Sequence, residues 1–110
     1  MELVSISSGR AIRCEITIPK KYNDGRDVEP ALHKLTWDEL VNRFGGATGN
    51  EGTGAWMHLG KVYEEGNYIY KVDVVDSSDI LFLRHEYKEV LKQRFDQKEI
   101  YIMMYPIWRA

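Results

Sequence analysis

The spacing of apolar residues along this chain switches between a strand-like period and a helix-like period, which constrains the fold more than any other feature. In AIRCEITI, residues 11–18, apolar and polar side chains alternate, as they do on a strand with one buried face. Val4 and Ile6 continue this parity and Ser8-Gly9 supplies a turn. We therefore expect a short extra N-terminal strand that pairs back as a hairpin.

A helix with clear start and stop signals is predicted between Thr36 and Gly45. The sequence TWDE matches a capping box, in which the Thr36 hydroxyl and the Glu39 carboxylate each accept a hydrogen bond from a backbone amide. Leu35 and Leu40 occupy the two positions of a hydrophobic staple. Gly45 favours the left-handed conformation that ends many helices.

The segments on either side of this helix have different characters. Residues 19–35 lack clear periodicity and include Asn-Asp-Gly at 23–25, so we expect a long, mobile loop there. After the helix, residues 55–59 and 67–75 have the composition of strands, and glycines bracket their connection. These two strands are predicted to form a hairpin.

A second long helix is predicted to begin near Asp76, whose carboxylate suits an N-cap. Residues 99–108 form a nearly continuous apolar strand, which favours a central or doubly covered position that ends at Pro106. The order of elements predicts an α+β, ferredoxin-like βαββαβ fold with the extra N-terminal strand. One domain, 1–110, would then place two helices on one face of an antiparallel sheet.

Five of the nine glycines lie between Gly45 and Gly54. A phosphate-binding loop of the Walker type needs lysine and a hydroxyl residue after its last glycine, but Ala55-Trp56 follow here. The stretch also lacks the Gly-x-Gly-x-x-Gly fingerprint of dinucleotide-binding folds. Both of these motifs are therefore excluded.

A weaker hypothesis keeps a binding role for this glycine-rich segment. In the predicted topology it lies near the start of the second helix, where backbone amides favour a small anionic or nucleotide-like ligand. The expected contacts are Thr48, Asn50, Thr53 and Trp56. Two alternatives stay open: the segment is only a flexible exit from the first helix, or Asp76 and Asp79 cap the second helix or join Glu51 around a hard cation.

A second hypothesis is a small acid/base enzyme. His58 lies in a predicted strand close to Tyr63 and Glu64, and these three could form a site in a dimer cleft. The histidines show no metal-binding spacing, and Cys14 sits in an apolar pattern typical of a buried, inert thiol. We therefore expect neither a metal nor a cofactor.

Charge and aromatic content bear on partners. The net charge is −2 and the pI about 5.9, so no broad positive field attracts nucleic acid, which makes it an unlikely partner. The chain lacks a signal sequence and a long apolar run, so we expect a cytoplasmic protein without membrane contact. Seven tyrosines and three tryptophans exceed what one helix layer can cover, which favours a homodimer or a stacked planar ligand.

Two stretches resemble known families. YKEVLKQRFDQKEIYI, residues 87–102, is similar to the Tyr-Lys…Arg-Phe-x-Gln helix end of small uncharacterised bacterial domains, and FGGATGNEGTGAW, residues 44–56, resembles a Gly-Gly-Ala-Thr segment of short phage-type proteins. The resemblance implies a ferredoxin-like fold and recurrent roles for Arg94 and Gln97 in tying the second helix to the sheet. It implies no activity.

These observations together favour a small, non-enzymatic binding protein that acts as a homodimer. Its ligand would lie against the segment from Gly45 to Gly54. The acid/base enzyme around His58 is the alternative, and a purely structural subunit of a larger assembly is a third possibility.

Overall fold

The computed structural model describes residues 9–110, so the strand predicted around Val4 and Ile6 lies outside the described residues. The elements in chain order are β1 (Arg10–Pro19), α1 (Pro30–Phe44), β2 (Thr48–His58), β3 (Lys61–Val74), α2 (Ser77–Leu81), a π-helical segment (Phe82–Tyr87), α3 (Lys88–Arg94) and β4 (Tyr101–Trp108). The last three helical segments run on without a break and form the second helix.

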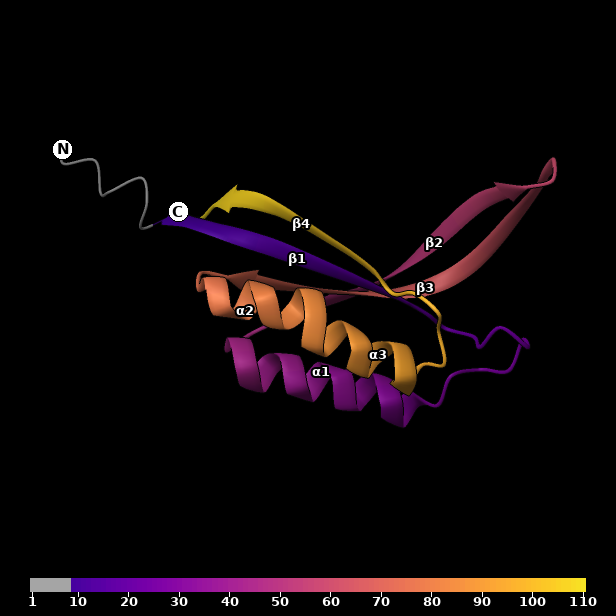
Figure 1. Ribbon diagram of the computed structural model, residues 1–110, viewed down its shortest axis with the longest axis horizontal. Helices are drawn as coiled ribbons and strands as arrows, with labels where there is room; N and C mark the ends of the chain where they lie inside the picture. The colour runs from indigo at the N-terminus through magenta and orange to yellow at the C-terminus, as the bar shows by residue number, and fades with distance from the viewer. Residues whose placement is uncertain (1–8) are drawn as a thin grey trace.

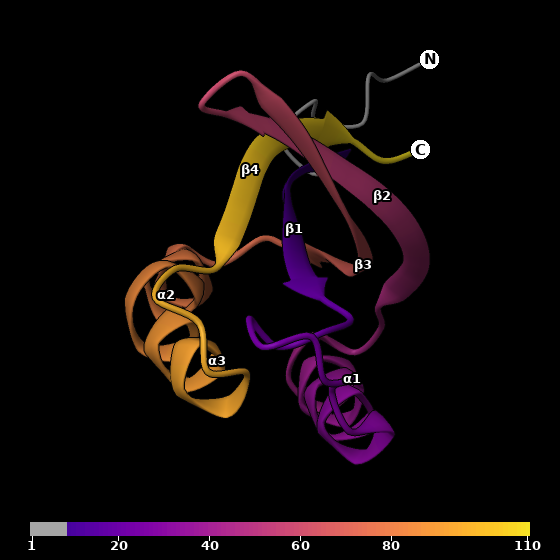
Figure 2. The same ribbon diagram turned by 90° about the vertical axis from the view of Figure 1, so that its right-hand side faces the viewer.

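One antiparallel sheet and two helices make up the molecule. The strand order is β2-β3-β1-β4, and each neighbouring pair is antiparallel. Both helices pack on the same face of the sheet, and the opposite face carries no helix (Figures 1 and 2). The predicted α+β class is confirmed, and the strand order is compatible with a ferredoxin-like fold.

The core lies between the sheet and the two helices. In β1 the residues Cys14, Ile16 and Ile18 are fully buried, as their alternation predicted. Burial raises the pKa of the Cys14 thiol to about 12, which fits an unreactive cysteine. From the helix side, Leu40, Leu83 and Leu91 close this core together with Phe95, which directly follows α3.

The start of α1 differs from the sequence-based prediction. The helix begins at Pro30, and its N-cap residue, Glu29, makes no side-chain cap. Thr36 is fully buried inside the helix, where its hydroxyl donates to the Leu32 carbonyl at 2.9 Å. The capping box was therefore wrong, because proline suits the first helical position and starts the helix earlier. Residues 30–35 belong to this helix and not to a loop.

The glycine-rich segment is mostly strand. Helix α1 ends at Gly45, as predicted, with a φ of 77°, but β2 already begins at Thr48. The predicted loop from Gly45 to Gly54 is therefore wrong beyond its first residues. Glycine suits the strand at Gly49 because a Cβ there would lie only 3.0 Å from the Trp37 ring.

Within residues 9–110, strand β4 lies at the edge of the sheet and pairs with β1 alone, so the predicted central or doubly covered position was wrong. Pairing continues past Pro106, which lies opposite Ile12, as far as Trp108 opposite Arg10. An edge strand tolerates proline because one side of its backbone has no strand to bond. The strand is not buried on both faces, since Tyr101 is 65% exposed.

The predicted hairpin of β2 and β3 is confirmed. Its turn consists of Leu59 and Gly60, which have φ values of 49° and 76°, and positive φ at both residues is typical of a type I′ turn. The outer part of this hairpin, residues 55–65, extends past the ends of both helices (Figure 1). We call it the hairpin arm. The molecule is elongated as a result, with extents of 56 × 31 × 22 Å.

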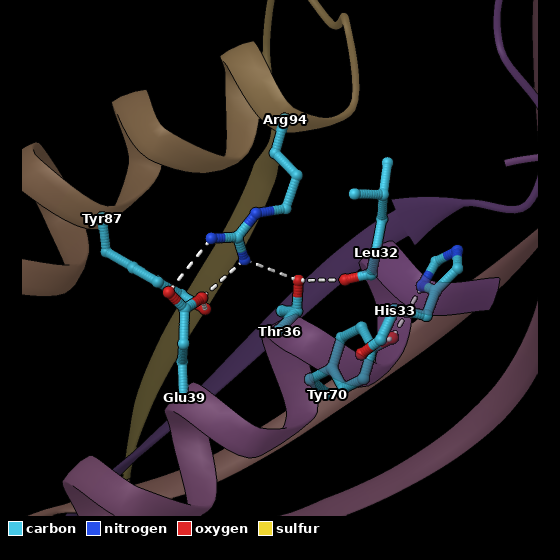
Figure 3. Close-up of polar contacts among 7 residues, drawn as sticks. All are labelled: Leu32, His33, Thr36, Glu39, Tyr70, Tyr87 and Arg94. Carbon is cyan, nitrogen blue, oxygen red and sulfur yellow. Dashed lines mark hydrogen bonds and ion pairs between the residues drawn. The ribbon is translucent and has the colours of Figure 1, made fainter. Parts of the chain in front are cut away.

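The second helix begins as predicted, because the Asp76 carboxylate accepts a hydrogen bond from the Ser78 amide at 2.8 Å. Near its other end, Arg94 bonds α1 and not the sheet, which corrects the role that the resemblance implied. Its guanidinium donates to both Glu39 carboxylate oxygens, at 2.5 and 3.0 Å, and to the Thr36 hydroxyl at 2.9 Å (Figure 3). This ion pair joins the two helices across their interface.

Within residues 9–110, no helix has both the length and the apolar character needed to cross a membrane. The cytoplasmic location stays a prediction.

Candidate ligand-binding cleft

A cleft of about 750 Å³ opens between α1 and the strands β2 and β3. Its volume lies within the range of about 300–1,000 Å³ that is typical of small-molecule sites. The aromatic and imidazole rings that line it are His33, Trp37, Tyr68 and Tyr70. Charged side chains from Lys20, Asp27, Lys34 and Glu51 complete its rim.

Local geometry brings these rings to one place. His33 and Trp37 are four residues apart on α1 and therefore share a helix face. Tyr68 and Tyr70 are two residues apart on β3 and share the sheet face that looks toward this helix. Gly49 lies opposite Tyr70 in β2, and its lack of a side chain lets the Trp37 ring pack directly over this strand.

His33 is the most unusual group in the cleft. Its side chain is only 9% exposed, and its Nδ1 atom lies 2.6 Å from the Tyr70 hydroxyl. The Tyr68 ring packs edge-on against the imidazole, with 4.3 Å between centroids. The other ring nitrogen, Nε2, is buried and has no hydrogen-bond partner among the described residues. Figure 3 shows that nitrogen on the side of the ring away from Tyr70.

Burial controls the charge of both partners. It lowers the pKa of His33, so the imidazole is neutral at neutral pH. It raises the pKa of the Tyr70 hydroxyl well above its ordinary value, and the nearby Tyr68 hydroxyl adds to that effect. The phenol therefore keeps its proton. A neutral imidazole with a free nitrogen suits hydrogen bonding to an uncharged part of a ligand.

An ion pair lies across one end of the cleft. Lys20 follows β1, and its Nζ atom lies 3.1 Å from a carboxylate oxygen of Glu51 on β2. The same ammonium group lies 5.1 Å from the centroid of the Tyr68 ring, within range of a cation–π contact. Because Glu51 is 62% exposed, the pair contributes little stability, and a ligand anion can replace the carboxylate at low cost.

Only one of the predicted ligand contacts lies at this cleft. Asn50 lines it, whereas Thr48 lines a separate shallow hollow beside Lys71. Thr53 is exposed farther along β2. Trp56 lies on the hairpin arm, where its ring stacks on Tyr63 with 5.7 Å between centroids. The structure therefore spreads these four side chains along β2.

The start of the second helix is occupied by groups of this chain. Asp76 caps that helix itself, and Asp79 forms an ion pair with Arg43 at the end of α1, with a closest distance of 3.0 Å. Glu51, which the cation hypothesis placed with these residues, bonds Lys20 in the cleft. Within the described range, 9–110, no three histidine, cysteine, aspartate or glutamate side chains are arranged to hold a metal ion.

The candidate acid/base residues lie on the hairpin arm. The rings of His58 and Tyr63 are 6.4 Å apart between centroids. Glu64 follows Tyr63 directly in β3, so the two side chains point to opposite faces of the hairpin. All three are exposed to solvent, and within one chain they do not enclose a substrate.

His33, Trp37, Tyr68 and Tyr70 were not selected as site residues from the sequence. The sequence-based prediction places His33 in a loop and treats the tyrosines as part of an aromatic surface. The signal was present: a histidine and a tryptophan at helical spacing, and Tyr-x-Tyr on a strand. His33 and Trp37 share a helix face because α1 begins at Pro30, earlier than the sequence-based prediction placed it.

No family model matches this chain, and no curated protein matches it. Among solved structures, a phage SAM lyase in complex with S-methyl-5′-thioadenosine is similar, with a TM-score of 0.63 and 12% identity over 89% of each chain. The likeness is one of fold. A phage SAM lyase in the apo state gives a TM-score of 0.63 at 15% identity, covering 100% of this chain and 96% of that one.

A Bacillus cereus protein related to NIF3 is also similar, with a TM-score of 0.58 and 11% identity. That match covers 90% of this chain but only 26% of the other, so most of this chain corresponds to about a quarter of that protein. At identities this low, the activity of these proteins cannot be transferred to this chain.

Proposed function

We propose that this protein binds a small nucleoside-like ligand in the cleft between α1 and the β2–β3 hairpin. The observation that carries this proposal is the unpartnered, buried Nε2 atom of His33, a residue that lines the cleft together with Trp37, Tyr68 and Tyr70. A buried polar atom without a partner costs stability, and a ligand that bonds it recovers that loss. The similar fold of a phage SAM lyase that holds S-methyl-5′-thioadenosine supports the choice of a nucleoside.

The cleft offers a different contact to each part of such a ligand. Trp37 and Tyr68 are partly exposed and present ring surfaces on which a planar base can stack. The imidazole of His33 supplies a directional hydrogen bond that fixes the orientation of the base.

An anionic group on the ligand is supported at the other end of the cleft. Lys20 and Lys34 place two ammonium groups on its rim. Pro30, at the start of α1, also lines it, and the N-cap residue Glu29 makes no side-chain cap there. The partial positive charge of a helix N-terminus favours an anion there. We therefore propose this end of α1, and not the glycine-rich segment, as the anion-binding region.

Calorimetric titration tests the function directly. S-methyl-5′-thioadenosine and adenosine monophosphate are titrated into the wild type and into Trp37→Leu, with Trp56→Leu on the hairpin arm as the matched control. We expect saturable binding that weakens about tenfold or more in Trp37→Leu and is unchanged in the control. If neither compound binds, or if affinity is lost only in Trp56→Leu, the proposal that the cleft binds the ligand is contradicted.

We also propose that the protein forms a homodimer through the hairpin arm. The large apolar side chains exposed there are Trp56, Met57, Leu59, Val62 and Tyr63. An apolar cluster of this kind on a projecting hairpin is typical of an interaction surface, and strand β2 offers a free edge to a second copy. Light scattering should show a dimer for the wild type and a monomer for Trp56→Glu. A monomeric wild type would exclude this proposal.

The acid/base alternative depends on that dimer. A second copy against the hairpin arm would enclose His58, Tyr63 and Glu64, which are exposed in a single chain. Replacing His58 by alanine separates the two functions. Lost turnover of the bound nucleoside with unchanged binding would favour an enzyme, whereas unchanged behaviour in both respects favours the binding protein.

A further inference from the structure

We infer that Tyr70 fixes the tautomer of His33, so that Nε2 carries the ring proton and the cleft selects ligands that present a hydrogen-bond acceptor to it. This inference rests on the proposed function, because it specifies the chemistry of the ligand that the cleft takes. It makes Tyr70 a positioning residue that acts on the ligand through His33.

The first step is the direction of the bond between the two side chains. The Tyr70 hydroxyl has one hydrogen and two acceptors within reach: Nδ1 of His33 at 2.6 Å and the His33 backbone carbonyl at 3.5 Å. The longer contact lies at the limit of hydrogen bonding, so the hydrogen goes to Nδ1. If Nδ1 carried a proton instead, the phenol would have only the poor carbonyl contact for its own hydrogen.

The second step follows from charge. The imidazole is neutral and the phenol is protonated, because burial disfavours the charged form of each. A neutral imidazole carries one ring proton, and Nδ1 accepts from Tyr70. The proton must therefore be on Nε2, which becomes a donor that no described residue accepts.

The third step gives the ligand class. His33 lines the same cleft as the Trp37 and Tyr68 rings, so a planar ligand stacked on those rings would offer its edge to the Nε2–H group. A ring nitrogen or a ring carbonyl accepts this hydrogen. A ring N–H at the same place would oppose one donor with another and be rejected. The cleft is thus expected to take a heteroaromatic ring, such as a purine, through an acceptor on its edge.

The tautomer is tested first, without any ligand. Long-range proton–nitrogen NMR correlations show which nitrogen of each histidine carries the proton. We expect the His33 proton on Nε2 in the wild type and a mixture of tautomers in Tyr70→Phe, while the exposed His85 stays the same in both. A wild-type His33 with its proton on Nδ1 would overturn the inference. A melting curve checks that Tyr70→Phe is folded.

The acceptor is tested with analogues of S-methyl-5′-thioadenosine in which one ring nitrogen at a time is replaced by C–H. The analogue that lacks the accepting nitrogen should bind the wild type about tenfold or more weakly than the parent nucleoside does. It leaves the Nε2 hydrogen of His33 without a partner. This difference in affinity between parent and analogue should disappear in His33→Ala and shrink in Tyr70→Phe. It should be unchanged in His85→Ala, the matched control.

The outcomes separate the two proposals. If the parent nucleoside does not bind, the proposed function fails, while the NMR result still decides the tautomer. If it binds but every analogue binds equally, the proposed function stands and the acceptor inference is wrong.

Discussion

His33 shows at the scale of one residue how folding removes a titratable group from water without satisfying it. Its Nδ1 atom has a partner, its Nε2 atom has none among the described residues, and the side chain is 9% exposed. Proteins that break the rule of satisfied buried polar groups commonly do so where a ligand binds. The same burial makes the stability of the protein depend on pH.

We expect the protein to lose stability as the pH falls below about 6.5, the ordinary pKa of histidine. Burial lowers the pKa of folded His33, so below that pH the unfolded chain binds a proton that the folded protein does not. Urea unfolding at about pH 7.5 and about pH 5.5 measures the effect. The loss should be smaller in His33→Gln, which does not titrate, than in the wild type or His85→Gln. Equal losses in all three would contradict this prediction.

The two helices are joined by a charged contact at the scale of elements. Arg94 on α3 is 11% exposed and bonds Glu39 and Thr36 of α1, while the Tyr87 hydroxyl donates to the same Glu39 carboxylate at 3.0 Å (Figure 3). The Arg94 and Tyr87 bonds lower the pKa of Glu39. Glu39 therefore accepts from two partly buried donor side chains at once.

Replacing Glu39 by alanine should lower the free energy of unfolding by about 1–3 kcal/mol, because it leaves donors of Arg94 and Tyr87 without an acceptor. Glu89→Ala is the matched control. It removes the partner of Lys92 at the surface, where the change should stay within about 1 kcal/mol. Chemical unfolding of the three proteins measures both values. Equal effects of the two substitutions would show that the interhelical contact stabilises the protein no more than a surface ion pair does.

The close approach of β2 to α1 depends on Gly49. A Cβ atom there would lie 3.0 Å from the Trp37 ring, so in Gly49→Ala that ring must shift slightly within the cleft. We expect weaker nucleoside binding and a changed tryptophan emission with the fold retained. Gly46→Ala, where a Cβ meets nothing within 4 Å, should change neither. Unchanged binding in Gly49→Ala would place the ligand elsewhere.

At the scale of the whole molecule, the hairpin arm is the part with least support from the core. Residues 55–65 are exposed throughout, whereas Tyr70, Val72 and Val74 farther along β3 are buried. Backbone hydrogen bonds that lack buried side chains around them open readily.

Hydrogen exchange should therefore be faster in the hairpin arm than in residues 70–74 of the same strand. If the arm joins two copies, its protection should rise with protein concentration and stay low in Trp56→Glu. The exchange of residues 70–74 serves as the internal reference, because the core does not depend on the partner. Slow exchange along the whole arm at every concentration would contradict this account.

Local patterns in the sequence were enough for the α+β class, β1, the hairpin, the end of α1 at Gly45 and the Asp76 cap. Each depends on neighbours within a few residues. The first turn of α1 was missed because TWDE satisfies the capping-box pattern, and Thr36 and Glu39 instead bond residues of the same helix and of the second helix. The position of β4 was missed because a run of apolar residues does not tell an edge from a centre.

The cleft illustrates the division between sequence and tertiary structure. The sequence by itself determined which faces of the helix and strands are apolar, since side-chain direction follows from the period of each element. Only the packing of α1 on β3 decided that His33 meets Tyr70, because those residues are 37 positions apart in the chain. Contacts at such separation depend on how the layers stack, and no local pattern encodes them.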